Sequence, residues 1–158
     1  MSITISKDGK GYLLEAAQRI EQPIEETFAF FSTARNLERI TPPTLRFEVL
    51  KLNPAEMQQG TLIDYRLRVH GIRLHWQSEI TVWEPPYRFV DQQRKGPYRW
   101  WIHEHLFKDD CGSTIVRDRV RYGMPLGPIV NWLFVARDVK KIFKYRANKL
   151  AEIFLSAR

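Results

Sequence analysis

The chain has 158 residues, 44% of them hydrophobic and 13% aromatic, which is enough apolar material for the core of one ordinary domain. We therefore expect a single domain over residues 1–158. The one cysteine, Cys111, excludes an internal disulfide and is expected in a surface turn. No apolar run reaches the length of a membrane span or of a signal-peptide core, so we expect a cytoplasmic protein without integral membrane contact.

The formal net charge of +7 raises nucleic acid or an anionic membrane as partners. The basic residues are nevertheless spread along the chain among acidic ones. Their densest group occupies the non-apolar positions of a predicted C-terminal helix: Arg137, Lys140, Lys141, Lys144, Arg146 and Lys149. A solvated helix face explains this group without a partner, so the sequence argues against nucleic acid.

The first part of the chain predicts one strand followed by two short helices. The strand covers Tyr12–Ile20, after a short polar start. Pro23 stands where a helix can begin, and Ile24–Phe31 carries glutamates in its first turn, as the helix dipole prefers. A second helix over Ala34–Ile40 ends at the Pro42-Pro43 pair.

From residue 45 to residue 122, apolar side chains recur at every second position, with turn signals at short intervals, which is typical of antiparallel hairpins. The six predicted strands are Leu45–Leu52, Gly60–Val69, Leu74–Glu84, Arg88–Arg94, Tyr98–Lys108 and Ser113–Tyr122. Turn-forming pairs such as His70-Gly71 and Gly96-Pro97 separate them. With the first strand they make a seven-stranded sheet.

After Pro125 and Pro128 the apolar period returns to 3.6, which predicts a long helix running to about residue 156. Its apolar stripe consists of Trp132, Ala136, Val139, Phe143, Leu150 and Phe154. One face of the sheet can be buried only if the sheet curls around this helix. The sequence therefore predicts an α+β fold, a strongly curved antiparallel seven-stranded sheet wrapped around a long C-terminal helix, with two short helices after strand one.

Side-chain alternation along the strands separates an inner face from an outer one. The inner strand positions and the helix stripe supply candidate ligand-binding residues: Tyr65, Trp76, Ser78, Phe89, Trp101, Tyr122, Trp132 and Phe143. Tyrosine and tryptophan have apolar bodies and polar tips, which suits a pocket lined by few polar groups. The same aromatic residues could instead fill a core.

Polar side chains lie on the same inner faces. They are Asp91, Arg99, His103, His105 and Asp118, and the predicted register places Asp118 about opposite His103. A buried charge is costly unless it is paired, so we expect these residues to contact one another. Asp91, Arg99 and His105 are candidate ligand-binding residues, while His103 and Asp118 are the candidate catalytic pair.

Three interpretations of this polar group remain open. His103 and Asp118 could form a general acid–base pair for a cyclisation, dehydration or hydrolysis. The group could instead be a satisfied hydrogen-bond network that fixes strand register. Two histidines two residues apart with a carboxylate across the strand pair also resemble a metal site, but no third firm ligand is apparent. We therefore predict no metal and no cofactor.

Several short motifs follow one another along the chain: Ile20 to Pro23 leading into Phe28-Ala29-Phe30-Phe31, Asn36 to Pro43, Gly60-Thr61, Trp83-Glu84-Pro85-Pro86, Gly96-Pro97-Tyr98, Trp101 to Phe107 and Gly112-Ser113-Thr114. Together they resemble the START-like superfamily, also called SRPBCC, which includes the birch pollen allergen fold and the polyketide cyclase/dehydrase and lipid transport proteins. The resemblance covers nearly the whole chain.

This resemblance implies a helix-grip fold with a deep pocket for lipids, polyketides, sterols or similar compounds. Relatives transport, sense, cyclise or hydrolyse from the same scaffold, so the resemblance does not fix the chemistry. We expect a binding protein for a small hydrophobic or amphipathic molecule held between the sheet and the last helix. The alternative is a cyclase, dehydratase or hydrolase that uses His103 and Asp118. The oligomeric state is left open.

Overall fold

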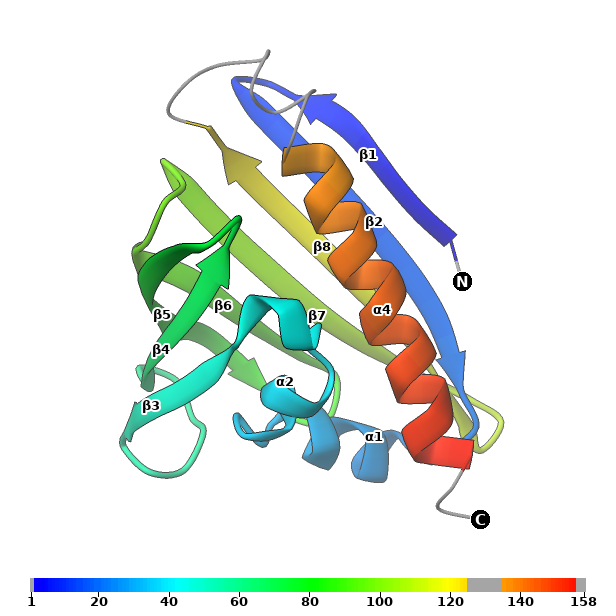
Figure 1. Ribbon diagram of the computed structural model, residues 1–158. Helices are drawn as coiled ribbons and strands as arrows, with labels where there is room; N and C mark the ends of the chain where they lie inside the picture. The colour runs from blue at the N-terminus through cyan, green and yellow to red at the C-terminus, as the bar shows by residue number, and fades with distance from the viewer. Residues whose placement is uncertain (1, 125–134, 156–158) are drawn as a thin grey trace.

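The computed structural model describes residues 2–124 and 135–155, and within them eight strands form one antiparallel sheet (Figure 1). The strands are β1 (Ser2–Asp8), β2 (Gly11–Ile20), β3 (Glu48–Asn53), β4 (Leu62–Val69), β5 (Ile72–Glu84), β6 (Arg88–Lys95), β7 (Trp100–Asp110) and β8 (Ser113–Gly123). The helices are α1 (Ile24–Phe31), α2 (Asn36–Arg39), the 3₁₀ turn η1 (Pro43–Leu45) and α4 (Ala136–Leu155).

The strand order is β1-β2-β8-β7-β6-β5-β4-β3, so β2 and β8 lie side by side although most of the chain separates them. The sheet bends around α4, which runs along its concave face and packs against β1 and β2 (Figure 1). The predicted α+β helix-grip architecture, a curved antiparallel sheet around a long C-terminal helix, is confirmed. Trp132, the first residue of the predicted helix stripe, falls outside the described residues.

The predicted strand number of seven is wrong, because the polar start of the chain forms the edge strand β1. This strand pairs with β2 from Ser2 opposite Ala17 to Asp8 opposite Gly11. Only Ile3 and Ile5 give the segment an apolar face, and two residues are too few for a convincing period of two. The two short helices consequently follow the second strand of the sheet, and α2 is shorter than predicted.

Two tight turns fix the register of the longest hairpins. His70 and Gly71 have φ angles of 49° and 82°, and Cys111 and Gly112 have φ angles of 53° and 86°. Each pair forms a two-residue connection with both residues in the left-handed region, the geometry that matches the twist of the flanking strands. Cys111 is exposed in its turn, as predicted.

Two apolar clusters hold the helices on the sheet. In the first, Phe28 of α1 lies 5.3 Å, ring centroid to centroid, from both Trp83 and Phe107, and Phe31 also lies 5.3 Å from Phe107. The second cluster joins α4 to β2 and β8 through Leu14, Ala16, Val120, Tyr122, Val139 and Phe143. α1 therefore covers one end of the sheet, while α4 covers β2 and β8.

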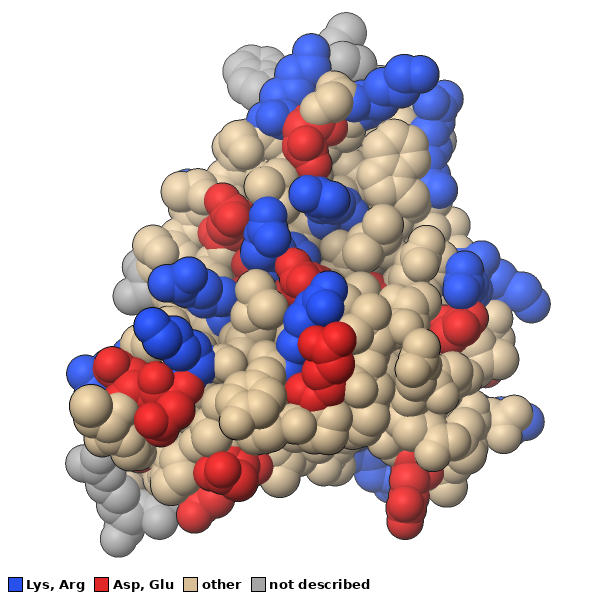
Figure 2. Space-filling model, turned by 180° about the vertical axis from the view of Figure 1, so that it is seen from behind, with Lys and Arg blue, Asp and Glu red and all other residues tan. Residues whose placement is uncertain are grey.

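The outer face of the sheet carries charges of both signs. Figure 2 shows basic and acidic side chains interspersed over the face behind α4. Arg88 and Arg94 each lie 2.7 Å from a glutamate oxygen on the neighbouring strand, that of Glu104 and of Glu79 respectively. No helix in the described part of the chain is long and apolar enough to cross a membrane.

Candidate functional site

A pocket of about 320 Å³ lies between the inner face of the sheet and α4. Its lining is mostly apolar and comes from α1, α2, η1, strands β4 to β7 and α4. Nine of the residues that the sequence predicts for a ligand site or a catalytic pair line it: Tyr65, Trp76, Ser78, Phe89, Asp91, Trp101, His103, His105 and Phe143. A larger hollow of about 540 Å³ lies near Lys51 and Glu56, away from both histidines.

Four predicted site residues lie elsewhere. Tyr122 is fully buried and stacks on Tyr12 at a ring-centroid distance of 5.6 Å, so it belongs to the second apolar cluster and does not line the pocket. Arg99 is exposed in the bend before β7, and its predicted inward orientation is wrong because alternation does not extend into that bend. Asp118 contacts the two histidines without lining the pocket. Trp132 lies outside the described residues.

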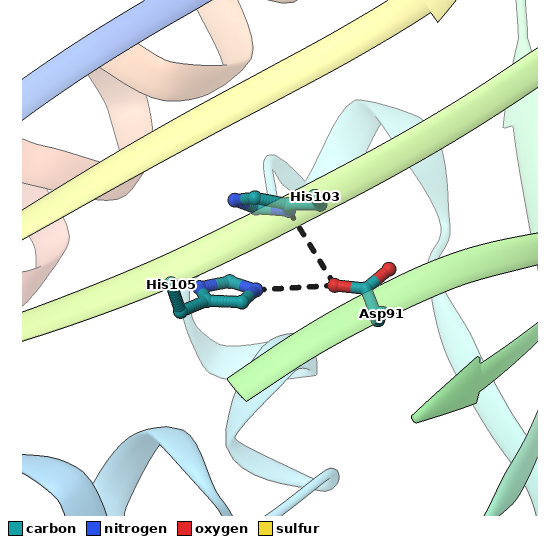
Figure 3. A group of neighbouring side chains, drawn as sticks. All are labelled: Asp91, His103 and His105. Atoms are coloured by element: carbon teal, nitrogen blue, oxygen red, sulfur yellow. Dashed lines mark hydrogen bonds and ion pairs between the residues drawn. The ribbon is translucent and has the colours of Figure 1, made fainter. Parts of the chain in front are cut away.

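Asp91, His103 and His105 converge on one point of the pocket wall (Figure 3). Asp91 on β6 is paired in register with His103 on β7, and alternation brings His105 to the same face. Oδ2 of Asp91 lies 3.1 Å from Nε2 of His105 and 3.6 Å from Nδ1 of His103. One donor atom from each of these residues lies within 4.8 Å of the others, so Asp91 supplies a third potential donor beside the two histidines.

Asp118 contacts the far side of the same two rings. Its Oδ1 atom lies 2.9 Å from Nε2 of His103, as a hydrogen bond, and 3.0 Å from Nδ1 of His105, as an ion-pair contact without hydrogen-bond alignment. The predicted register is wrong here, because Asp118 lies opposite His105 and Val120 lies opposite His103. The turn uses two residues instead of the predicted four, which shifts the pairing by two positions.

Arg146 of α4 completes the group, and the sequence interpretation assigned it wrongly to a solvated helix face. It is only 8% exposed, and its Nη2 atom lies 3.6 Å from Oδ1 of Asp118. Its guanidinium also lies 5.1 Å from the ring centroid of Phe31. The signal for its burial was its spacing, since Val139, Phe143, Arg146 and Leu150 follow the four-three-four pattern of a buried helix stripe.

The charges of this cluster balance. Burial disfavours ionisation of Asp118, but the positive charge of Arg146 and the hydrogen bond to His103 outweigh it and hold the pKa of Asp118 well below its usual value. Burial likewise opposes ionisation of Asp91, whose hydrogen bond to His105 lowers its pKa. Two carboxylates therefore remain ionised in the interior.

The pKa values of the two histidines shift in opposite directions. Burial lowers the pKa of His103, and the neighbouring His105 lowers it further. Burial also disfavours the charged form of His105, but its contacts with Asp118 and Asp91 outweigh burial and raise its pKa. Near pH 6.5, a charged His105 and Arg146 thus compensate Asp91 and Asp118, while His103 is neutral.

Ser78 fixes the remaining oxygen of Asp91. The Ser78 hydroxyl donates to Oδ1 of Asp91 at 3.4 Å, and it accepts from Nε1 of Trp76 at 3.1 Å. The phenol of Tyr65 lies 2.8 Å from the same hydroxyl. Burial and the charge of Asp91 raise the pKa of Tyr65 well above its usual value, so this phenol stays protonated. Asp91 therefore turns Oδ2 toward the histidines.

A curved antiparallel sheet that holds an apolar pocket against one long helix defines the helix-grip class of proteins. Within this class, the family described as "Polyketide cyclase / dehydrase and lipid transport" matches residues 20–154. The chain therefore belongs to this family. Among the curated proteins, none matches the chain.

Solved structures show the same fold at low sequence identity. Protein Ms6760 from Mycobacterium smegmatis aligns with a TM-score of 0.72 and 15% identity over 99% of this chain and 100% of its own. Ara h 8.0201 aligns with a TM-score of 0.69 and 12% identity over 92% and 99%. The Zhui aromatase/cyclase from Streptomyces sp. R1128 has a TM-score of 0.69 and 14% identity over 89% and 91%.

Proposed function

We propose that this protein binds a small amphipathic molecule in the pocket between the sheet and α4. The apolar body of the ligand lies against the aromatic and aliphatic wall, and its oxygen-bearing end lies at Arg146 and the two histidines. The ligand class follows from the pocket lining and agrees with a family whose description names lipid transport and polyketide chemistry.

The observation that carries the proposal is the pairing of an apolar pocket with a buried cation. The volume of about 320 Å³ falls within the range of about 300–1,000 Å³ that is common for small-molecule sites. Arg146 lines this pocket. Its Nη2 atom is in ion-pair contact with Asp118 at 3.6 Å, but neither Nε nor Nη2 makes a hydrogen bond to any described residue. A buried donor without an acceptor is costly, so a ligand carboxylate or carbonyl oxygen at this position stabilises the complex.

Calorimetric titration with decanoate and with decanol tests this proposal, because the two probes share a chain length and differ in the polar end. We expect decanoate to bind about tenfold more tightly, since a hydrogen bond to a charged group contributes about 1.5–3 kcal/mol. Leu67 lines the pocket from β4, so Leu67→Trp should weaken both probes.

The matched control is Arg66→Trp, which places the same large ring on the exposed face of the same strand. It should leave both affinities unchanged. Equal weakening by the two tryptophan variants, or no binding of either probe to the wild type, would contradict the proposal.

A second candidate function is catalysis, and the arrangement around His103 favours it. The neutral His103 ring contacts Asp118 through Nε2, which leaves Nδ1 as a lone-pair nitrogen on the pocket wall. Such a base could remove a proton from a carbon next to a carbonyl group in a cyclisation or dehydration, or activate water in a hydrolysis. Turnover of a panel of poly-β-ketone and ester substrates, lost in Asp118→Asn and in His103→Gln, would support this candidate. Binding of the panel without turnover would remove it.

A further inference from the structure

We infer that Asp91, His103 and His105 form a binding site for a divalent transition-metal ion of the zinc class. The site lies in the polar wall of the pocket. Its test is separate from that of the proposed function, because a metal titration involves no organic ligand.

The spacing of the three ligand atoms suits a tetrahedral ion. Zinc binds histidine nitrogen and carboxylate oxygen at about 2.0–2.2 Å, which separates two ligands of a tetrahedral ion by about 3.4 Å. Oδ2 of Asp91 lies 3.1 Å from Nε2 of His105 and 3.6 Å from Nδ1 of His103. All three atoms lie within 4.8 Å of one another (Figure 3). Small side-chain movements therefore bring them into coordination distance.

The opposite end of each proposed ligand is already held by a second polar residue. One oxygen of Asp118 lies 2.9 Å from Nε2 of His103 and 3.0 Å from Nδ1 of His105, which are the two ring atoms turned away from the proposed ion. Ser78 holds Oδ1 of Asp91 at 3.4 Å. A carboxylate hydrogen-bonded behind a metal-binding histidine fixes its tautomer and ring orientation, as Asp118 does for His103, while its contact with His105 is an ion-pair contact. This arrangement is independent of the ligand spacing itself.

The formal charge of the cluster also favours a cation. With both histidines neutral, as metal ligands must be, Asp91 and Asp118 contribute two negative charges and Arg146 one positive charge, which leaves a net charge of −1. The ion-pair contact of Arg146 is with Asp118, the carboxylate that does not coordinate the ion. The guanidinium therefore stabilises the supporting carboxylate.

The fourth coordination position faces the pocket, because all three proposed ligands line it. Zinc sites with three protein ligands keep such a position for water or for an oxygen of the bound molecule. An ion would use the lone pair on Nδ1 of His103, so metal binding and a general-base role of that nitrogen exclude each other.

Calorimetric titration of untagged protein with Zn²⁺ tests the site, after removal of metals with a chelator. We expect one ion per chain in the wild type. Asp91→Asn and His103→Gln should abolish this binding, since each removes a ligand. Asp118→Asn should weaken it by about 10- to 100-fold, because the histidines lose the group that orients them.

The matched controls are His70→Gln and His75→Gln. These exposed histidines also lie near carboxylates, with Nε2 of His70 2.6 Å from Asp138 and Nε2 of His75 4.0 Å from Asp64. Both controls should bind Zn²⁺ as the wild type does. Circular dichroism identifies any variant that fails to fold.

A cobalt experiment needs no variant, so it tests for tetrahedral metal coordination even if the substitutions disturb folding. Co²⁺ in a tetrahedral nitrogen and oxygen site gives strong visible absorption, and we expect these bands in the wild type and their loss on addition of Zn²⁺. Absence of both Zn²⁺ binding and the Co²⁺ bands, or binding that disappears in His75→Gln and persists in Asp91→Asn, would overturn the inference.

Discussion

Arg146 on α4 and Asp118 on β8 form a buried ion pair, with Nη2 and Oδ1 3.6 Å apart and each side chain 10% exposed. This contact joins the middle of the long helix to the strand that supports both histidines. It therefore ties the position of the helix to the electrostatics of the pocket wall.

Replacement of Arg146 by methionine should destabilise the protein strongly. Methionine keeps the apolar stem but leaves Asp118 without its cation, and loss of one partner of a buried ion pair costs about 3–5 kcal/mol. Urea unfolding measures the change. The control is Lys144→Met, at an exposed position of the same helix, which should change the free energy of unfolding by less than about 0.5 kcal/mol. Equal effects of the two substitutions would contradict the burial of Arg146.

Phe28→Ala should show that α1 is held by aromatic packing. The Phe28 ring lies 5.3 Å from Trp83 and 5.9 Å from Phe89, in a fully apolar cluster. Truncation leaves a cavity, and such changes cost about 3–5 kcal/mol. Tyr87→Ala is the control because Tyr87 is 63% exposed, and it should change the free energy of unfolding by less than about 0.5 kcal/mol. A similar loss in both variants would contradict this account.

The metal-free protein should lose stability in acid through Asp91 and Asp118. The folded-state pKa of each lies below the ordinary value of 3.8, so each contributes stability above pH 3.8 that is lost as the pH falls through the folded-state value. Urea unfolding between pH 2 and 6, with a chelator present, measures this loss. Asp118→Asn should reduce the slope in acid, whereas Asp109→Asn, at an exposed position of β7, should not. The same slope in wild type and Asp118→Asn would contradict the prediction.

The two histidines should titrate on opposite sides of pH 6.5 in the metal-free protein. The pKa of His105 is raised by its contacts with Asp118 and Asp91, which outweigh burial, and that of His103 is lowered by burial and by His105. Nuclear magnetic resonance of the ring nitrogens follows both residues, and the midpoints describe a coupled pair. Asp118→Asn should lower the upper midpoint. Two midpoints at or above pH 6.5 would argue against a neutral His103.

Most of the fold could be predicted from the sequence, because its strongest signals, the periods of its apolar residues, are local. Alternation between residues 45 and 122 and the stripe of the last helix predicted the strands β3 to β8 and α4. The strand β1 was missed because Ile3 and Ile5 are its only apolar side chains, and edge pairing depends on backbone hydrogen bonds that the side-chain pattern does not encode.

The site was predicted less completely, because it depends on register and on contacts between distant elements. Alternation placed His103, His105 and Asp91 on one face, as found. The exact turn length could not be read from Asp109 to Gly112, so Asp118 was placed opposite the wrong histidine. The burial of Arg146 was not predicted, because its charge was taken to indicate an exposed position although its spacing places it on the apolar stripe of the helix.

The position of the cluster on β6 and β7 has a consequence for the dynamics of the pocket. These two strands are the central pair of the eight, so their backbone groups bond on both sides and should exchange amide hydrogen most slowly. The opposite wall comes from η1, α2 and β4, which lies next to the edge strand β3, and we expect these segments to open at lower free energy. An occupant of different shape would then be accommodated by movement of that wall, while the aspartates and histidines keep their spacing.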